Sequence, residues 1–196
     1  SLDPASGGGH VEKLGGLSSY VTGSLHSKRA ILLVSDAYGY EAPNLRKLAD
    51  KIADNEFYVV VPDFLYGDPY VPETYPSAQD WLKNHGVDKG FEDAKPVIEA
   101  LKSKGVTSIG AAGFCWGAKV VVELAKGELI RAALLLHPSF VTVDDIKEVK
   151  VPISVLGAEI DKMSPPELLK QFESILAAKS EVDGHVKIFP KVAHGW

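Results

Sequence analysis

The single cysteine of the chain, Cys115, lies in the sequence Gly113-Phe114-Cys115-Trp116-Gly117. Glycines two residues before and two residues after a nucleophile are typical of a nucleophile elbow, a sharp turn between a strand and a helix. Such a turn lifts the nucleophile out of the sheet and places it at a helix N-terminus, where backbone N–H groups favour a thiolate and an oxyanion. The pattern predicts a nucleophilic cysteine rather than a small buried hydrophobic residue.

A thiol nucleophile needs a base, and an acid is expected between the two in chain order. His194 follows the last apolar run and is the predicted base, whereas His137, at an earlier strand end, can equally form a structural His-Pro turn. Asp161 is the predicted acid, with Glu159 as its rival, because the turn from Gly157 brings the fifth residue back over the sheet edge. Asp161 would orient His194 and stabilise its imidazolium form.

An oxyanion hole needs two N–H groups, and the predicted donors are Trp116, directly after the nucleophile, and Ala37, in the loop after the first buried strand. Asp36 in that loop is either a loop cap or a carboxylate near the thiol. The aromatic segment from Phe64 to Trp81 is predicted to line or cover the pocket. The predicted pocket or thiol-control residues are Asp36, Tyr38, Phe64, Tyr66 and Trp81.

The elements that position these residues follow from the hydrophobic pattern. Continuous apolar runs are typical of strands buried on both faces, and they cover 30–34, 59–61, 109–114, 132–136, 153–156 and 186–189. Apolar residues at spacings of three and four predict helices over 44–54, 91–102, 119–125 and 166–178. The last helix is expected to begin with a capping box in which Ser164 is the N-cap and Glu167 its partner.

Strands that alternate with helices predict an α/β fold with a mostly parallel sheet in three layers. The chemistry of such folds lies beyond the carboxyl ends of the strands, where the candidate residues cluster. Residues 1–27 are interpreted as a lead-in with an edge strand around Tyr20–Thr22, and residues 28–196 as the main part of one single domain.

Composition narrows the range of functions. The 196 residues are 45% hydrophobic and carry a formal net charge of −5, which argues against nucleic acid or an anionic membrane as the main partner. One cysteine allows no internal disulfide, and with no apolar run of membrane-spanning length we expect a cytoplasmic protein. No pair of His or Cys residues has metal-ligand spacing and no nucleotide motif occurs, so no metal and no cofactor are predicted. The expected partner is a small ester or lactone substrate, and a monomer is favoured.

The chain resembles the dienelactone hydrolase family, the branch of the α/β-hydrolases that uses cysteine. The resemblance runs from about Lys28 to the end and rests on five motifs: Asp36 to Gly39, Val61 to Asp63, the elbow at Gly113, the Gly-x-x-x-Asp turn ending at Asp161, and Ala-His-Gly at Ala193. It implies a three-layer α/β-hydrolase fold, a triad of Cys115, Asp161 and His194, and hydrolysis through a thioester acyl-enzyme. The details resemble the plant branch, whose members often carry a mixed-linkage endo-beta-glucanase label.

The sequence departs from the family pattern at several positions. Asp36 stands where well-studied bacterial members have Glu, and Trp116 replaces a smaller aliphatic residue. The three arginines, Arg29, Arg46 and Arg131, do not lie in strand-end loops, so none matches the arginine that binds a substrate carboxylate in the family. The closing helix that follows the catalytic histidine in the family is expected to be absent from this chain.

Two other functions stay open. A β-glucanase needs two carboxylates about 5–10 Å apart, and Asp36, Asp63 and Asp161 supply carboxylates at strand ends, although this hypothesis leaves Cys115 unexplained. A non-catalytic or thiol redox-sensing member of the fold would use an oxidation-prone thiol at a helix N-terminus.

Overall fold

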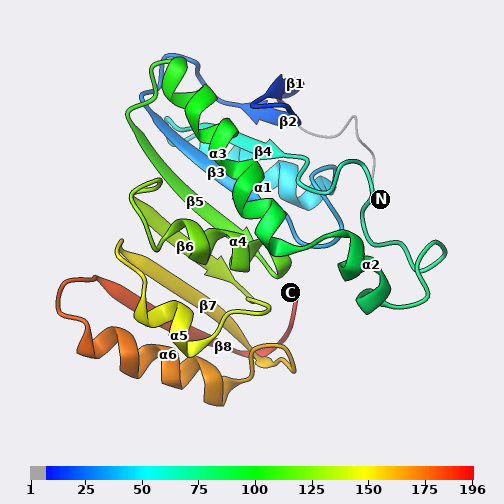
Figure 1. The fold of residues 1–196 in the computed structure, drawn as a ribbon. Coiled ribbons are helices and arrows are strands. Elements are labelled where there is room, and N and C mark those ends of the chain that lie inside the picture. The colour runs from blue at the N-terminus through cyan, green and yellow to red at the C-terminus, as the bar shows by residue number, and fades with distance from the viewer. Residues whose placement is uncertain (1–7) are drawn as a thin grey trace. The chain divides into compact units, whose positions relative to one another are not determined.

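The computed structural model describes residues 8–196 and divides the chain into two compact units, Ser1–Ile109 and Gly110–Trp196 (Figure 1). Residues 1–7 of the predicted lead-in lie outside the described residues. Strands alternate with helices along most of the chain, which confirms the predicted α/β class with mostly parallel strands. Within residues 8–196, no helix combines the length and the apolar composition needed to cross a bilayer.

The first unit contains the strands β1 (His10–Leu14), β2 (Leu17–Thr22), β3 (Arg29–Val34) and β4 (Tyr58–Pro62), in the spatial order β1-β2-β4-β3. β1 and β2 form an antiparallel hairpin, β2 pairs antiparallel with β4, and β3 pairs parallel with β4. The predicted edge strand around Tyr20–Thr22 is therefore an inner strand, and β1 lies outside it. Gly15 and Gly16 have positive φ angles and allow the tight hairpin turn that adds β1.

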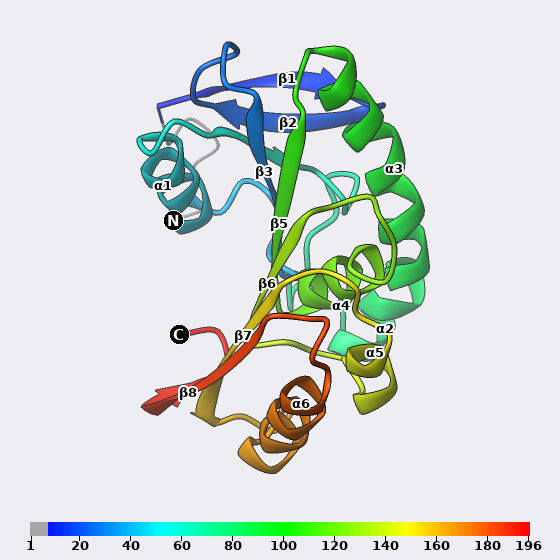
Figure 2. The same ribbon diagram turned by 90° about the vertical axis from the view of Figure 1, so that its left-hand side faces the viewer.

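Three helices belong to the first unit: α1 (Pro43–Ala53), α2 (Ala78–Asn84) and α3 (Val87–Ser103). α1 and α3 lie on opposite sides of this unit's strands (Figure 2). α3 begins four residues earlier than the apolar spacing predicts, and Pro96 lies inside it. The buried face of α3 consists of Gly90, Ala94, Val97, Ile98 and Leu101.

The second unit holds the parallel strands β5 (Ser108–Phe114, which begins at the unit boundary), β6 (Ala132–Leu136), β7 (Ile153–Ile160) and β8 (Gly184–Ala193). Its helices are α4 (Trp116–Leu124), α5 (Val143–Lys147) and α6 (Pro166–Ala178), which lie together on one side of these strands (Figure 2). α6 has the predicted bounds, and its apolar face buries Leu169, Phe172 and Leu176.

The predicted capping box of α6 is wrong. Pro165 is the N-cap residue and makes no side-chain capping bond. The Ser164 hydroxyl instead donates to the Pro138 carbonyl at 2.6 Å, which ties the start of α6 to the loop after β6. A capping box that the sequence analysis missed begins α5, where Thr142 and Asp145 bond reciprocally.

Asp145 also anchors α5 to α4 through a buried ion cluster. Its carboxylate accepts hydrogen bonds from Lys119 at 2.8 Å and Lys126 at 2.7 Å, and its side chain is only 7% exposed. Burial raises the pKa of Asp145, but the bonds from the two lysines and from Thr142 outweigh burial and hold the pKa at about 2. The charged carboxylate therefore stabilises the folded second unit at neutral pH.

Candidate active site

The carboxyl ends of β5 to β8 converge because the four strands are parallel, and the pairing of β7 with β8 resumes at Ile160 after a register shift that follows Ala158. Phe114 pairs with Leu136, Leu136 with Leu156, and Ile160 with Ala193. The ladder continues past the strands, since His194 N donates to Ile160 O at 3.1 Å. Residues that follow these ends are therefore brought to one edge of the second unit.

Cys115 occupies the predicted elbow between β5 and α4. Its φ of 55° and ψ of −111° are strained for a residue with a side chain, and backbone strain of this kind is typical of functional sites. A Cβ added to Gly113 would lie 2.3 Å from the Gly117 carbonyl oxygen, so this turn requires glycine at 113. The elbow places the sulfur at the N-terminus of α4, with Trp116 as the first residue of the helix.

The structure brings the three predicted triad residues together in the second unit. His194 Nε2 lies 3.1 Å from Cys115 Sγ, and His194 Nδ1 lies 2.8 Å from Asp161 Oδ2. Asp161 Oδ1 accepts bonds from the N–H groups of Met163 and Ser164, which fix the carboxylate. The rival acid, Glu159, instead accepts a bond from the Lys191 N–H.

The contacts of His194 favour its charged form. The hydrogen bond to Cys115 and the bond to Asp161 raise the pKa of His194 to about 9, against the opposing effect of burial. An imidazolium at this position favours a thiolate on the neighbouring sulfur. The second unit therefore holds a thiol, an imidazole and a buried carboxylate in the order that nucleophilic catalysis requires.

Ser139 is a member of the site that the sequence analysis missed. Its hydroxyl lies 3.1 Å from Cys115 Sγ, its N–H donates to the Cys115 carbonyl, and its side chain is fully buried. A hydroxyl in this position can donate a hydrogen bond to a thiolate. Ser139 follows His137 and Pro138 at the end of β6, so its place at a strand end was a signal that could have found it.

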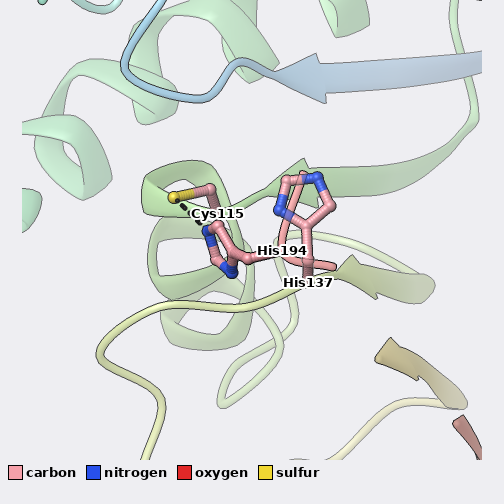
Figure 3. Close-up of side chains that lie close together, drawn as sticks. All are labelled: Cys115, His137 and His194. Atoms are coloured by element: carbon pink, nitrogen blue, oxygen red, sulfur yellow. Dashed lines mark hydrogen bonds between the residues drawn. The ribbon is translucent and has the colours of Figure 1, made fainter. Parts of the chain in front are cut away.

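His137 is the second residue that the structure adds. Its ring packs edge-on against that of His194, with the ring centroids 4.8 Å apart, and one ring nitrogen of each histidine and the Cys115 sulfur all lie within 4.8 Å of one another (Figure 3). Burial, and then the charge of His194, lower the pKa of His137 to about 4. The sequence shows no metal-ligand spacing among these residues, but parallel strands bring together residues that are distant in sequence.

The remaining predicted residues belong to the first unit. Asp36 Oδ1 accepts a bond from the Tyr38 N–H at 2.9 Å, which supports the loop-cap interpretation of Asp36. The Ala37 carbonyl accepts a bond from Tyr70 N, and the role of Ala37 as an oxyanion donor stays a prediction. Tyr38 is exposed and borders a shallow hollow with Asp63 and neighbouring loop residues.

The aromatic residues predicted for the pocket divide into two groups. Phe64 and Trp81 are 3% and 2% exposed, so they offer almost no surface to a ligand. The Trp81 ring N–H donates to the Asp68 carbonyl, and the ring stacks on His85. Tyr66 is exposed, and its hydroxyl bonds to Asp93 of α3. Phe64 and Trp81 therefore pack within the first unit, and their role in a substrate pocket stays a prediction.

The fold and the site define an α/β-hydrolase type of protein, and comparison with known proteins agrees. The family model described as "Dienelactone hydrolase family" matches residues 17–196. The chain therefore belongs to the dienelactone hydrolase family. A putative dienelactone hydrolase from Klebsiella pneumoniae has the same fold, with a TM-score of 0.76 at 17% identity over 91% of this chain and 82% of that one.

Curated relatives carry several names. An endo-1,3;1,4-beta-D-glucanase from Zea mays is 46% identical over 86% of this chain, which spans 54% of the maize protein. The hydrolase pyvD of Aspergillus violaceofuscus is 32% identical, with 100% of this chain and 82% of that protein covered. A carboxymethylenebutenolidase homolog from Mus musculus is 31% identical over 97% of this chain and 80% of its own.

Proposed function

We propose that this chain hydrolyses a small ester or lactone through a thioester intermediate on Cys115. The observation that carries the proposal is the pair of contacts made by His194, 3.1 Å to the Cys115 sulfur and 2.8 Å to Asp161. Family membership supports hydrolysis, and the carboxymethylenebutenolidase name of the mouse relative supports a lactone among the substrates.

The proposed reaction has two halves. The Cys115 sulfur attacks the ester carbonyl carbon, and the Trp116 N–H stabilises the oxygen anion of the tetrahedral intermediate. The intermediate collapses to a thioester as the ester C–O bond breaks, and the departing alkoxide takes a proton from His194. His194 then removes a proton from water, which attacks the thioester and releases the acid and the thiol. Asp161 orients His194 throughout.

The exposed residues that neighbour the triad in the chain are of mixed character. Phe140, Ile160 and Met163 are exposed and apolar, whereas Lys162, directly after Asp161, is exposed and charged. Of the arginines, Arg46 is 1% exposed, and Arg29 lies over the Phe57 ring. Arginine is the best-suited residue for binding a carboxylate through two parallel hydrogen bonds, so the placement of Arg29 and Arg46 away from the strand ends argues against a bidentate arginine anchor for a substrate carboxylate.

The test is hydrolysis of p-nitrophenyl acetate by this chain and by its Cys115→Ala variant. We expect the variant to lose at least ~10³-fold in kcat/KM, since removal of a nucleophile leaves only binding and the oxyanion hole. Retained esterase activity in Cys115→Ala would refute the thiol mechanism.

The name of the maize relative makes β-glucan a second substrate to test. Asp161 is bonded to His194, which leaves it poorly placed as a free glycosidase carboxylate. We expect no sugar release from mixed-linkage β-glucan, and release that persists after iodoacetamide treatment would favour a glycosidase. Ready sulfenylation of Cys115 with no acyl adduct from any activated ester would favour a redox-sensing role.

A further inference from the structure

We propose that Cys115, His137 and His194 form a binding site for one thiophilic divalent cation, best matched by Zn²⁺, and that the bound cation blocks the nucleophile. The three residues follow the ends of β5, β6 and β8, and one donor atom from each lies within 4.8 Å of the others. The group goes beyond the proposed triad because His137 has no step in hydrolysis.

The donor set suits zinc. One thiolate and two imidazoles are common zinc ligands, with a Zn–S distance of about 2.3 Å and Zn–N distances of about 2.0–2.1 Å. Tetrahedral geometry then needs ligand atoms about 3.3–3.6 Å apart. Cys115 Sγ and His194 Nε2 are 3.1 Å apart, and the widest spacing in the group must contract by about 1 Å. Hard oxygen-seeking cations such as Mg²⁺ and Ca²⁺ do not suit these donors.

His137 supplies the second, independent observation. The residue is only 6% exposed, and its Nδ1 is a buried atom with no hydrogen-bond partner within the described residues. Most buried polar atoms have a partner, so an unpartnered ring nitrogen points to a ligand. Figure 3 shows one ring nitrogen of His137 on the side where Cys115 lies.

The surroundings of His194 already match those of a metal-binding histidine. Such a residue usually donates its other ring N–H to a carboxylate, which fixes the ring and increases its basicity. Asp161 Oδ2 accepts from His194 Nδ1 at 2.8 Å and has no exposed side-chain surface. A cation on Nε2 would therefore leave the Asp161–His194 bond intact.

Cation binding would replace the hydrogen bond between Cys115 and His194 with bonds from both residues to the metal. The Cys115–His194 pair gives up the proton that it shares, and Sγ and Nε2 bind the cation in its place, so one proton is released for each cation bound. Three protein ligands leave one position for water or another small ligand. The sulfur lone pair is then engaged, and Cys115 is not available to attack a carbonyl. Inhibition rests on the proposed function, whereas binding does not.

The direct test is titration of the tag-free chain with Co²⁺, a spectroscopic substitute for Zn²⁺, followed by competition with Zn²⁺. We expect one equivalent to give a thiolate-to-cobalt charge-transfer band that Zn²⁺ abolishes. Cys115→Ser should lose the band. His137→Phe, which keeps an aromatic ring against His194, should weaken cobalt binding by at least about 10- to 100-fold. A loss of this size already follows removal of a group that only hydrogen-bonds to a metal ligand. His185→Gln, an exposed histidine of β8, is the matched control and should bind like the parent chain.

His137→Asn is a second variant in case His137→Phe does not fold, because His137 has a φ of 34° and asparagine tolerates positive φ. Absence of the charge-transfer band in the parent chain would overturn the site. Unchanged cobalt affinity in the folded His137 variants would overturn the role of His137. In esterase assays, Zn²⁺ should inhibit hydrolysis and a chelator should restore it. Strong cobalt binding in a chain without esterase activity would uphold the metal site and refute only the proposed function.

Discussion

Replacement of Asp161 by asparagine tests the orientation of His194 with little change in shape. Asp161 Oδ1 accepts the N–H groups of Met163 at 2.8 Å and Ser164 at 3.1 Å, whereas Oδ2 accepts from His194. In Asp161→Asn, the two backbone donors hold the amide oxygen, and the new NH₂ group must face His194 Nδ1. Nδ1 then becomes an acceptor, and the ring proton moves to Nε2, on the side of Cys115.

The size of the effect follows from these contacts. Loss of a hydrogen bond to a charged group costs about 1.5–3 kcal/mol, which corresponds to ~10- to 150-fold in rate. The wrong tautomer also prevents His194 from accepting the thiol proton, and in serine hydrolases the same exchange costs about 10⁴-fold. We therefore expect kcat/KM for p-nitrophenyl acetate to fall by ~10²- to 10⁴-fold in Asp161→Asn.

Two further variants make this prediction specific. Glu159→Gln changes the rival acid, whose contact is the Lys191 N–H, and should keep kcat/KM within about twofold. Asp161→Ala leaves two backbone donors without a partner and should lose about 1–3 kcal/mol of unfolding free energy in addition to activity. More than a tenth of the parent activity in Asp161→Asn, or an equal loss in Glu159→Gln, would refute the assignment of Asp161.

Three other predictions concern the second unit. Ser139→Ala should lower kcat/KM about tenfold or more, because a hydrogen-bond donor to the thiolate is lost. Ser174→Ala, on the exposed face of α6, is the control and should keep the parent activity. Equal activities of the two variants would show that Ser139 does not belong to the site. Asp145 has a pKa of about 2 in the folded chain, against the ordinary value of 3.8, so its charged form stabilises the folded state. This contribution to the unfolding free energy is complete above pH 4–5 and decreases as the pH falls, by ~1 kcal/mol at pH 3 and ~2 kcal/mol at pH 2. Urea unfolding should show this acid-dependent loss in the parent and not in Asp145→Asn. Gly113→Ala should give insoluble protein or protein that is unfolded by circular dichroism, because the added Cβ would overlap backbone atoms of Gly117. A well-folded variant would contradict the close approach of β5 and α4 at the elbow.

Sequence patterns were sufficient to predict strands, helix bounds and site residues where hydrophobic spacing or position at a strand end determines the structure. The apolar runs predicted the parallel strands, but the expected burial on both faces holds for β4, whose residues are all buried, and not for β8, which has no buried residue. The spacing of Leu169, Phe172 and Leu176 gave α6 its bounds. The strand-end rule placed Cys115, Asp161 and His194 at one edge, since the carboxyl ends of paired parallel strands lie at the same edge of a sheet.

Features that depend on tertiary contacts were not predictable in the same way. Ser164 has the residue type of an N-cap, but the nearby Pro138 carbonyl takes its hydroxyl. Trp81 is an aromatic residue of the kind that often lines pockets, but it is buried and contacts Asp68 and His85. Ser139 reaches the Cys115 sulfur because the chain turns sharply after β6, with positive φ at His137 and Phe140, and no spacing rule encodes that path.

Rapid quenching of the reaction with p-nitrophenyl acetate, followed by peptide mass spectrometry, tests the central claim most directly. The predicted result is a transient acyl group on the Cys115 peptide that is absent from Cys115→Ala and forms more slowly in Asp161→Asn, in which His194 has the wrong tautomer. A thioester is the covalent intermediate expected from the 3.1 Å contact between Cys115 Sγ and His194 Nε2. An acyl group on another residue, such as Ser139, or full turnover by Cys115→Ala with no adduct, would contradict it.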